Sequence, residues 1–309
     1  MKVSLIATVK DASGEIEAFL ESLAGQTRMP DEVVVVDGGS TDGTLRRLRE
    51  TDGITLIEEP GANIARGRNV AIAAATHDAI AVTDADCVLE PDWLGRLLEP
   101  LEAGADVAMG FYRPIADGFL PSCMAAINLP DADEVDEARF MPSSRSVAFR
   151  REAIEAAGGY PEWLDIGEDM YVDHRWRELG LAMRFVPDAV VRWRLRSSLR
   201  ETWVQYFRYA RGDAIAGMHA ERHALRFGVY AAALYTWGSK GRLREAAMLA
   251  GGTAYASGPV RRALARFEDP IDRAKALVAV PALMAFTDLA KMAGHVSGLG
   301  AQGRAPARR

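Results

Sequence analysis

Two aspartates that follow an apolar stretch carry the clearest candidate chemistry. In AIAVTDADC, residues 79–87, Asp84 and Asp86 are separated by a single residue and come directly after the run Ala79–Val82. Residues two apart in an extended segment point to the same side, and two close carboxylates repel each other. A divalent cation such as Mg²⁺ or Mn²⁺ prefers oxygen ligands and would relieve that repulsion. The spacing therefore indicates a cation site, with capping of the next helix as the alternative interpretation.

A glycine-rich turn carries a second set of polar side chains. In VVVVDGGSTDGT, residues 33–44, an apolar run typical of parallel sheets is followed by a turn that contains Asp37, Ser40 and Asp42. Glycine in such a turn lets the backbone approach a ligand closely. Neither the P-loop pattern GxxxxGK[ST] nor the dinucleotide pattern GxGxxG occurs in it. The turn indicates a ligand-binding loop of another kind, and a well-capped helix entry is the alternative.

Up to about residue 110, strand-like and helix-like sequence patterns alternate. The strands and helices that they predict must position the candidate residues. Apolar residues at Ile16, Phe19, Leu20 and Leu23 predict one helix face, and Pro91 predicts the first turn of another helix. This alternation is typical of an α/β fold with βαβ units, whose ligands bind at the carboxyl ends of the parallel strands. The predicted strands are Val3–Val9, Val33–Asp37, Ile54–Ile57, Ala79–Thr83 and Asp106–Gly110.

The rest of the chain follows other patterns. Residues 111–145 contain several prolines and the acidic run DADEVDEA, which predict a loop or a lid. SVAFRREAIEAAGGYPE then predicts a strand and a helix that stops at Gly158 or Gly159. From about residue 200 the pattern is helical, with the apolar pieces FGVYAAALYTW, AAMLAGGTAYA and ALVAVPALMAF, and the last residues, GAQGRAPARR, predict a disordered tail.

Composition excludes several classes of protein. The 309 residues, of which 49% are apolar and 26% charged, are typical of a folded protein with one large domain or one domain plus an appendage. A net charge of −6 argues against nucleic acid as a partner. Two cysteines without a CxxC pattern favour a reducing compartment such as the cytosol and no structural zinc. Because no window of about 18 uninterrupted apolar residues occurs, we expect no membrane-spanning helix.

An ordered set of motifs resembles family 2 glycosyltransferases, the inverting, nucleotide-sugar-dependent enzymes with the GT-A fold. The resemblance extends over about residues 3–212 and implies a Rossmann-like, mostly parallel central sheet flanked by helices, with a helical C-terminal extension. It implies a nucleotide-sugar-binding half at 1–110, an acceptor-binding and catalytic half at 111–225 and an extension at 226–309. The motifs that carry it are SLIATVKD, VVVDGGSTDGT, ARGRN, TDADC with PDWL, AFRREAIEAAGGYPE and GEDMYVDHRWRELG.

The resemblance implies a nucleotide site at the ends of the first strands. Asp37 would contact the nucleobase, with the backbone at Ala7 and Thr8 and the guanidinium of Arg68 completing that site. Asp84 would lie by the ribose and the metal ion. Many relatives carry a second acid directly after the first at this turn, whereas glycine follows Asp37 here, so the nucleotide is left open between UDP and GDP.

The resemblance also implies the catalytic groups. Asp86 would be the main protein ligand of a Mn²⁺ or Mg²⁺ ion that bridges the diphosphate, and Asp169 matches the general base. Glu168 stands beside this base and should raise its pKa if the two side chains lie close together. The alternative for Glu168 and Asp169 is that one of them stabilises the N-terminus of a helix.

Acceptor residues are implied in two places. QYFRY, residues 205–209, is similar to the QxxRW element of processive synthases, so Arg208 would contact the diphosphate and Tyr209 would stack on a sugar. Gln205 and Trp163 are assigned to the acceptor with Tyr209. Ordinary helix packing is the alternative for the aromatic residues. A metal-binding histidine found in relatives is not assigned, because Trp193 or an arginine stands at the corresponding place.

The C-terminal helices allow two interpretations. Amphipathic helices with basic flanks can lie in a lipid interface, which would place a cytoplasmic enzyme peripherally at the inner face of the cell membrane. The other interpretation is packing against the catalytic domain or against the partner in a homodimer.

The function predicted from the sequence is transfer of a sugar from a UDP- or GDP-sugar to a hydroxyl of a glycan, a lipid-linked acceptor or a small molecule. A sugar-phosphate nucleotidyltransferase is disfavoured, since ATVKDASGEIE stands where a GGxGTR-like loop should follow the first strand. A sugar-nucleotide-binding protein without transfer activity is disfavoured, because both acidic pairs are intact.

Overall fold

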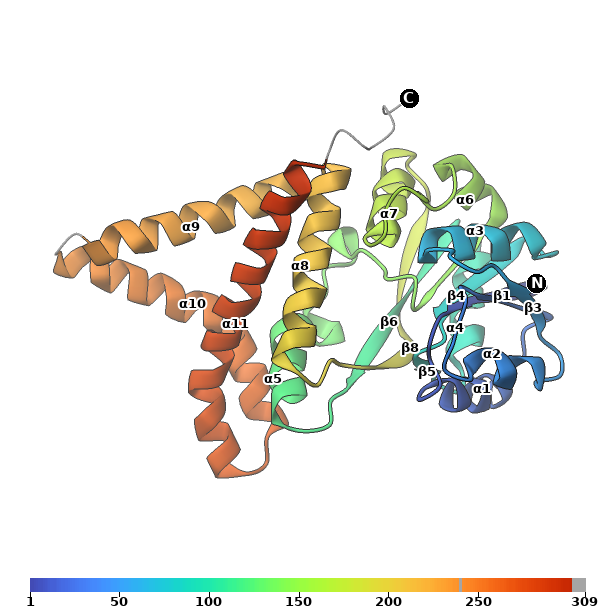
Figure 1. Ribbon diagram of the computed structural model, residues 1–309, viewed down its shortest axis with the longest axis horizontal. Coiled ribbons are helices and arrows are strands. Elements are labelled where there is room, and N and C mark those ends of the chain that lie inside the picture. Colours follow the sequence, from blue (N-terminus) through green and yellow to red (C-terminus); the bar gives the residue numbers. More distant parts are fainter. Residues whose placement is uncertain (239–240, 302–309) are drawn as a thin grey trace. The chain divides into compact units, whose positions relative to one another are not determined.

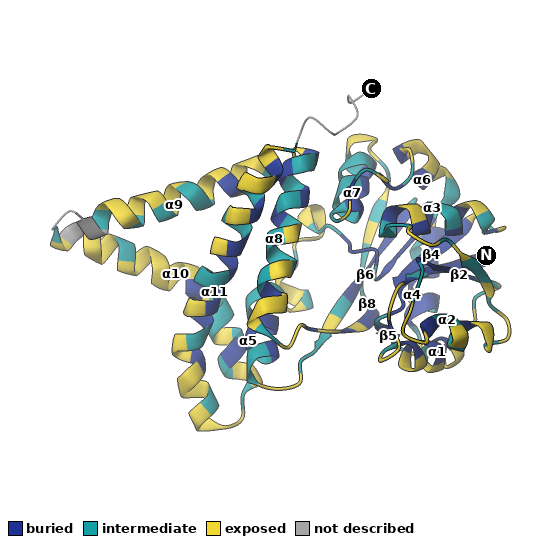
Figure 2. Cartoon of the chain, in the orientation of Figure 1, coloured by how far each residue is buried: buried dark blue, intermediate teal, exposed yellow. Residues whose placement is uncertain are grey.

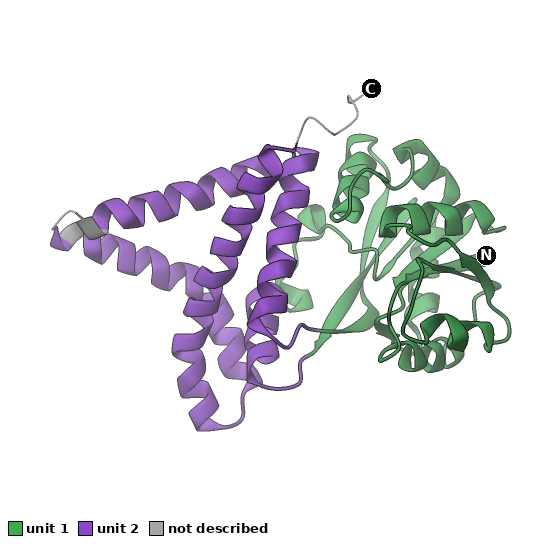
Figure 3. Cartoon of the chain, in the orientation of Figure 1, with its two compact units in different colours: residues 1–115, 131–194 green, residues 116–130, 195–309 purple. Residues whose placement is uncertain are grey.

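The computed structural model describes residues 1–238 and 241–301. The chain forms two compact units (Figure 3). Unit 1 comprises residues 1–115 and 131–194, and unit 2 comprises residues 116–130 and the chain from Leu195 onward. The division into functional parts at residues 110 and 225 stays a prediction.

Unit 1 is built on a single sheet of eight strands in the order β3-β2-β1-β4-β7-β6-β8-β5 (Figure 1). The strands predicted near the N-terminus all occur, and their bounds shift by a few residues. The strands are β1 (Val3–Val9), β2 (Glu32–Asp37), β3 (Thr55–Glu58), β4 (Ala79–Asp84), β5 (Cys87–Leu89), β6 (Val107–Ile115), β7 (Val147–Arg150) and β8 (Met183–Arg194).

The four N-terminal strands all pair with one another in parallel. β1 pairs in parallel with β2 on one side and with β4 on the other, and β2 pairs in parallel with β3. The chain therefore moves outward from β1 to β3 and then crosses to the other side of β1 to form β4. Open α/β sheets bind their ligands at such a reversal, outside the carboxyl ends of the strands.

The helices of unit 1 bury the faces that their sequences predict. α1 buries Ile16, Phe19, Leu20 and Leu23, as expected from their spacing, and α6 ends at Gly158, whose φ of 86° is left-handed. The helices are α1 (Ile16–Ala24), α2 (Thr44–Arg49), α3 (Ile64–Ala74), α4 (Trp93–Glu102), α6 (Arg151–Ala157) and α7 (Glu168–Glu178), with two short 3-10 helices at Ala132–Glu134 and Glu137–Arg139.

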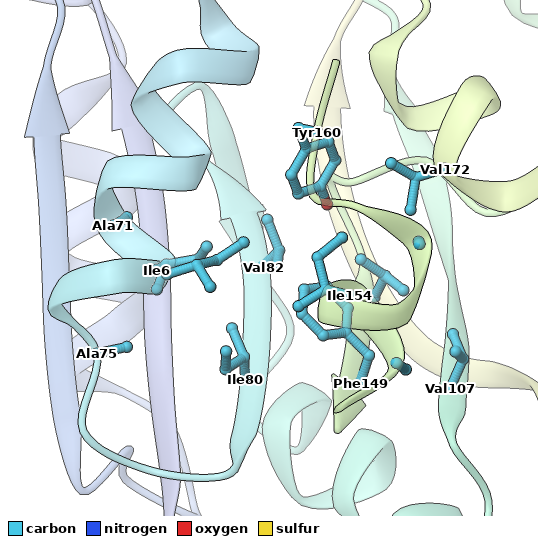
Figure 4. Packing of buried hydrophobic residues seen from close by; sticks show 14 of the residues in the cluster. Ile6, Ala71, Ala75, Ile80, Val82, Val107, Phe149, Ile154, Tyr160 and Val172 are labelled. Carbon is cyan, nitrogen blue, oxygen red and sulfur yellow. The ribbon is translucent and has the colours of Figure 1, made fainter. Parts of the chain in front are cut away.

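The main hydrophobic cluster of unit 1 joins the centre of the sheet to α3, α6 and α7. Figure 4 shows Ile6, Ile80 and Val82 from the parallel strands facing Ala71 of α3, with Phe149 and Ile154 beside them. Burial of each large apolar side chain contributes roughly 1.5–3 kcal/mol. The cluster thus fixes α3 and α7 against the sheet, and these two helices carry predicted site residues.

Residues 111–145 are more regular than predicted. β6 continues to Ile115, and α5 (Phe119–Asn128) follows it. Pro121 lies in the first turn of α5, where a backbone N–H has no helical partner, so proline does not interrupt the helix. The prediction of a loop or lid over this whole segment was wrong, because Pro114 lies within β6 and Pro121 lies in the first turn of α5, where neither ends its element.

Unit 2 is helical, and the three predicted apolar pieces lie in three of its helices. Its helices are α5, α8 (Leu199–Ala216), α9 (Ala220–Gly238), α10 (Arg242–Arg266) and α11 (Pro270–Leu299). α11 packs closely on α8 at Gly298. A Cβ on this glycine would lie only 2.5 Å from the carbonyl oxygen of Arg211 on α8. The predicted disordered tail lies outside the described residues from residue 302 onward.

One helix among the described residues is long and apolar enough to cross a membrane. In α11 an 18-residue window reaches a mean hydropathy of 1.5, and 33% of that window is buried inside the structure. The sequence criterion of an uninterrupted apolar run did not find it, because Lys275, Asp288 and Lys291 interrupt the run. The expectation that the chain does not cross a bilayer therefore stays an untested prediction.

Gly110 occupies an irregular point of the sheet where no side chain fits. The pairing of β6 with β8 shifts register between Met109 and Phe111. A Cβ on Gly110 would lie 2.0 Å from Ser146 Oγ and 2.7 Å from the carbonyl oxygen of Ala189. The Ser146 hydroxyl is itself fixed there, since it accepts a hydrogen bond from Trp93 Nε1 at 2.8 Å and donates to Ala189 O at 3.0 Å.

We expect Gly110→Ala to lower the free energy of unfolding by about 1–3 kcal/mol, because the added methyl group overpacks a rigid site. Urea unfolding measures the change. Gly14→Ala is the matched control, since a Cβ there meets nothing within 4 Å, and it should leave the unfolding midpoint nearly unchanged. Equal midpoints for both variants would contradict the packing explanation.

Candidate active site

The sheet brings two of the predicted aspartates to one edge but directs them to different faces. At the carboxyl end of β1, Val9 pairs with Asp37 on β2, and Thr8 pairs with Asp84 on β4. Side chains alternate along a strand, so partners of consecutive residues point to opposite faces. A ligand that contacts both carboxylates must therefore cross the carboxyl end of β1.

Asp37 presents a buried oxygen toward this edge. Its carboxylate Oδ1 accepts hydrogen bonds from the backbone N–H groups of Gly39 and Ser40, both at 2.8 Å. Gly39 has a φ of 95°, which permits this tight turn. Asp37 Oδ2 is buried and has no hydrogen-bond partner among the residues that the structure describes. A buried carboxylate oxygen without a partner is costly, so Asp37 is suited to accept a hydrogen bond from a ligand.

Arg68 lies at the centre of a buried ion-pair cluster. Its side chain is 2% exposed, and its Nη2 and Nη1 donate to Asp84 Oδ1 at 2.7 Å and Glu168 Oε1 at 2.5 Å. Gly67 allows α3 to approach the sheet closely, since a Cβ there would lie 2.9 Å from Thr8 Cγ2. The structure thus places Arg68 against two carboxylates, and its predicted contact with the nucleobase stays a prediction.

The charges in this cluster shift the pKa values of its members. Burial alone would raise the pKa of Asp84, but the Arg68 and Arg145 guanidinium groups hold it below the usual range. Burial and the charge of Asp169 raise the pKa of Glu168 to about 7, although Arg68 opposes the shift. Although burial alone would lower the pKa of Arg68, the neighbouring carboxylates raise it, so this guanidinium stays charged.

The two consecutive acids of α7 lie in different environments. Gly167, with a φ of 84°, precedes the helix, and Glu168 is its first residue. Glu168 is 4% exposed and bonded to Arg68, whereas Asp169 is half-buried. Asp169 Oδ2 accepts a hydrogen bond from Ser143 Oγ at 3.4 Å. Of these two acids, Asp169 is therefore the one that a substrate can reach.

Asp86 does not lie in an extended strand. β4 ends at Asp84, and Ala85 and Asp86 form the turn before β5, so the argument that both aspartates point to the same side was wrong. Asp86 is half-buried, and its Oδ1 accepts a weak hydrogen bond from Cys87 Sγ at 3.6 Å. Burial, followed by the charge of Asp86, raises the pKa of the Cys87 thiol well above its usual range.

The donor set fits a Mg²⁺ or Mn²⁺ ion that takes only part of its ligands from the protein. The described part of the chain contains no cluster of three His, Cys, Asp or Glu residues that could hold a metal ion. Mg²⁺ commonly binds through one or two carboxylates together with substrate phosphates and water. Asp86 suits such a role, while Asp84 is already paired with Arg68 and Arg145.

Several residues of the cluster were missed by the sequence analysis. Arg145 lies with its Nε 3.7 Å from Asp84 Oδ2, Tyr160 packs its ring under the Arg68 guanidinium at 5.2 Å, and Ser144 Oγ lies 2.9 Å from the Tyr160 hydroxyl. Asp173, one turn after Asp169, is buried, and burial and the Asp169 charge raise its pKa well above the usual range. The polar run SSRS at 143–146, inside an otherwise buried segment, was the available signal.

The remaining predicted residues are placed as follows. Ala7 is fully buried, so only its backbone can face a ligand. Trp163 packs edge-to-face against Tyr171, with ring centroids 5.5 Å apart. Gln205, Arg208 and Tyr209 lie on α8 in unit 2, where Gln205 Nε2 donates to the Tyr209 hydroxyl at 2.9 Å. The roles assigned to these side chains stay predictions.

Comparison with solved structures confirms the predicted fold. The chain is similar to the mannosyltransferase PcManGT from Pyrobaculum calidifontis, a structure solved in complex with GDP-Man and Mn²⁺. The TM-score is 0.57 at 23% sequence identity, and the match covers 96% of this chain and 87% of that chain. The α/β architecture is therefore the GT-A fold with a helical C-terminal extension.

Sequence comparison with known proteins defines the class of protein. The profile described as Glycosyl transferase family 2 matches residues 4–130. The succinoglycan biosynthesis protein ExoA of Rhizobium meliloti is 30% identical over 225 residues, 68% of each chain. The O-antigen chain rhamnosyltransferase RfbN of Salmonella typhimurium is 26% identical over 222 residues, 67% of this chain and 71% of the relative. These similarities and the fold define the protein as a glycosyltransferase. The chain belongs to glycosyl transferase family 2.

Replacing Glu168 with glutamine should weaken the dependence of the unfolding free energy on pH. Because the pKa of Glu168 is raised from 4.5 to about 7 on folding, the folded state keeps a proton that the unfolded chain releases between these values. Titration of Glu168 should therefore lower the unfolding free energy by about 2–3 kcal/mol as pH rises through this range, and Glu168→Gln should lack this contribution. Urea unfolding from about pH 5 to pH 8 measures the difference.

The exposed Glu155 on α6 supplies the control for this series. Glu155→Gln should follow the wild-type dependence on pH. If the unfolding free energy of Glu168→Gln also changed with pH as much as that of the wild type, the raised pKa of Glu168 would be contradicted.

Proposed function

We propose that the protein is an inverting, metal-assisted glycosyltransferase that moves a sugar from a nucleoside-diphosphate donor to a hydroxyl of a glycan or lipid-linked acceptor. One observation carries the proposal. Asp84 and the consecutive acids Glu168 and Asp169 come from distant parts of the chain and meet near the carboxyl edge of the parallel strands, where Arg68 bonds to Asp84 and Glu168 and Ser143 bonds to Asp169. Asp37 adds a buried oxygen without a partner at the same edge, suited to a nucleobase N–H group.

The reaction needs one base. The acceptor hydroxyl must lose its proton while it attacks the anomeric carbon from the face opposite the departing diphosphate. Asp169 is the half-buried acid of its pair, and the Ser143 hydroxyl that donates to it fixes the direction of one carboxylate oxygen. Glu168 is held by Arg68, so it supports the orientation of the helix start rather than taking the proton.

A divalent cation held by Asp86, and by Asp84 if that carboxylate is released, would stabilise the negative charge of the leaving diphosphate as a Lewis acid. The structure of PcManGT in complex with GDP-Man and Mn²⁺ supports a nucleotide sugar and a divalent cation as partners. Relatives named for succinoglycan biosynthesis and for O-antigen rhamnosyl transfer support a role in cell-envelope polysaccharide biosynthesis. The choice between UDP and GDP, the sugar and the acceptor are left to experiment.

Asp169→Asn and Asp86→Ala should each lower sugar transfer by a factor of at least about 100, because one removes the base and the other the proposed ion ligand. Only Asp86→Ala should weaken the binding of nucleotide in the presence of Mn²⁺. A screen of UDP- and GDP-sugars with Mn²⁺ identifies the donor, and product analysis by mass spectrometry then measures transfer.

The same measurements separate the alternatives. A binding protein without transfer activity would bind a sugar nucleotide and release no nucleoside diphosphate with any acceptor. A nucleotidyltransferase would release pyrophosphate from a nucleoside triphosphate. Full turnover by both variants would contradict the assigned roles.

We also propose that the helices of unit 2 contact the inner face of the cell membrane. In residues 195–309, 18 Lys and Arg residues stand against 8 Asp and Glu residues. Large apolar side chains are exposed on the same helices, including Leu234 (76% exposed), Leu249 (74%) and Val278 (75%), and Figure 2 shows the exposed surface along α9 and α10. Exposed apolar side chains with basic neighbours suit an anionic lipid surface.

The double variant Leu234→Asp with Leu249→Asp should reduce binding to vesicles of phosphatidylglycerol and phosphatidylcholine at least about tenfold, because charged side chains oppose entry into the lipid interface. Vesicle co-sedimentation measures the binding. Leu179→Asp, at an exposed leucine of unit 1, is the control. If the wild type ignores vesicles and elutes as a dimer that the double variant loses, a second copy of the chain covers these side chains and the membrane proposal is wrong.

A further inference from the structure

Two guanidinium groups face Asp84 among the described residues, and they differ in how firmly they are held. Arg68 has a side chain that is 2% exposed and donates to both Asp84 and Glu168. Arg145 has a side chain that is 22% exposed, and its Nε lies 3.7 Å from Asp84 Oδ2. Of the two, Arg145 is therefore the one that a ligand at the sheet edge can reach with least disturbance.

The position of Arg145 is set by an aromatic ring. Its guanidinium carbon lies 4.5 Å from the centre of the Trp193 ring on β8. Trp193 pairs with Cys87, the residue that follows Asp86 in the chain. A guanidinium stacked on a ring keeps the N–H groups at its edge available for planar, bidentate contacts with phosphate. The Trp193 ring therefore holds the Arg145 guanidinium beside Asp84, and the strand residue paired with Trp193 directly follows Asp86.

Arg145 also reaches toward the proposed base. Its Nη1 donates to Ser143 Oγ at 3.1 Å, and the Ser143 hydroxyl lies 3.4 Å from Asp169 Oδ2. One side chain therefore joins the donor side of the site, at Asp84, to the acceptor side, at Asp169.

The carboxyl groups of the site favour a guanidinium such as that of Arg145 at the place where a diphosphate binds. The two arginines face the carboxyl groups of Asp84 and Glu168, Asp169 lies beside them through Ser143, and a diphosphate adds further negative charge. Arg68 is already balanced by two carboxylates within the cluster. Arginine–phosphate pairs are among the strongest hydrogen-bonded contacts in proteins, so exchange of a 3.7 Å ion pair for one of them is favourable.

We propose that Arg145 binds the diphosphate of the sugar-nucleotide donor, an inference that rests on the proposed function. In the bound state its guanidinium turns from Asp84 to the phosphate oxygens while it remains stacked on Trp193. As the bond from the anomeric carbon to the diphosphate breaks, negative charge grows on the leaving group, and a guanidinium fixed beside it lowers the barrier.

Isothermal titration calorimetry with Mn²⁺ present tests this contact with four probes: UDP, GDP, uridine and guanosine. Arg145→Met keeps the length of the side chain and removes its charge. For the diphosphate that the wild type binds, this variant should lose affinity by about tenfold or more, whereas affinity for the matching nucleoside should stay unchanged. Arg145→Lys should restore part of the affinity, because it returns a charge without the bidentate fork. Arg184→Met, at an exposed arginine near the other end of β8, is the matched control and should bind as the wild type does.

The outcomes separate this inference from the proposed function. Wild-type affinity for the diphosphate in Arg145→Met would overturn the inference and leave the proposed function standing. Equal losses for diphosphate and nucleoside in a folded Arg145→Met, with no recovery in Arg145→Lys, would mean a structural role and would also overturn it. A wild type that binds none of the four probes would contradict the proposed function itself.

Discussion

The burial of one guanidinium group is the constraint on which the arrangement of the site depends. Removing a charge from water costs several kcal/mol unless opposite charges compensate it inside the protein. Arg68 is compensated by Asp84, 16 residues later, and by Glu168, 100 residues later. Because the buried guanidinium bonds to carboxyl groups from two other elements, the end of β4, the helix α3 and the start of α7 are held together as one structure.

This constraint also separates the roles of two neighbouring acids. Successive residues of a helix point about 100° apart around its axis, so one of them can face the protein interior while the next faces the site. Glu168 faces Arg68 and is buried, and the adjacent Asp169 is left half-buried beside Ser143. The ion pair that stabilises the fold thereby fixes the position of the proposed base without using it.

The helices of unit 2 are joined by a different kind of contact. Asp288 on α11 accepts hydrogen bonds from Arg226 and Tyr230 on α9 and from Tyr255 on α10. Asp288 is 4% exposed, whereas Leu225 and Leu234 on α9 and Leu249 on α10 are exposed. Asp288 and its partners therefore join α9, α10 and α11, together with buried apolar residues of α11 such as Val280 and Leu283.

The ordered motifs predicted the family and, through that resemblance, the GT-A fold, and local periodicity predicted the N-terminal strands and the buried face of α1. The sequence by itself could not determine the extent of β6, the helix α5 or the direction of Asp86, since these depend on turns and pairing partners outside the local pattern. Tertiary structure alone decided that Arg145 lies beside Asp84, that Arg68 is enclosed by two carboxylates, and that Glu168 is buried while Asp169 is accessible. The physical reason is that ion pairs and burial depend on distances in space between residues far apart in the chain, and the spacing of residue types does not encode those distances.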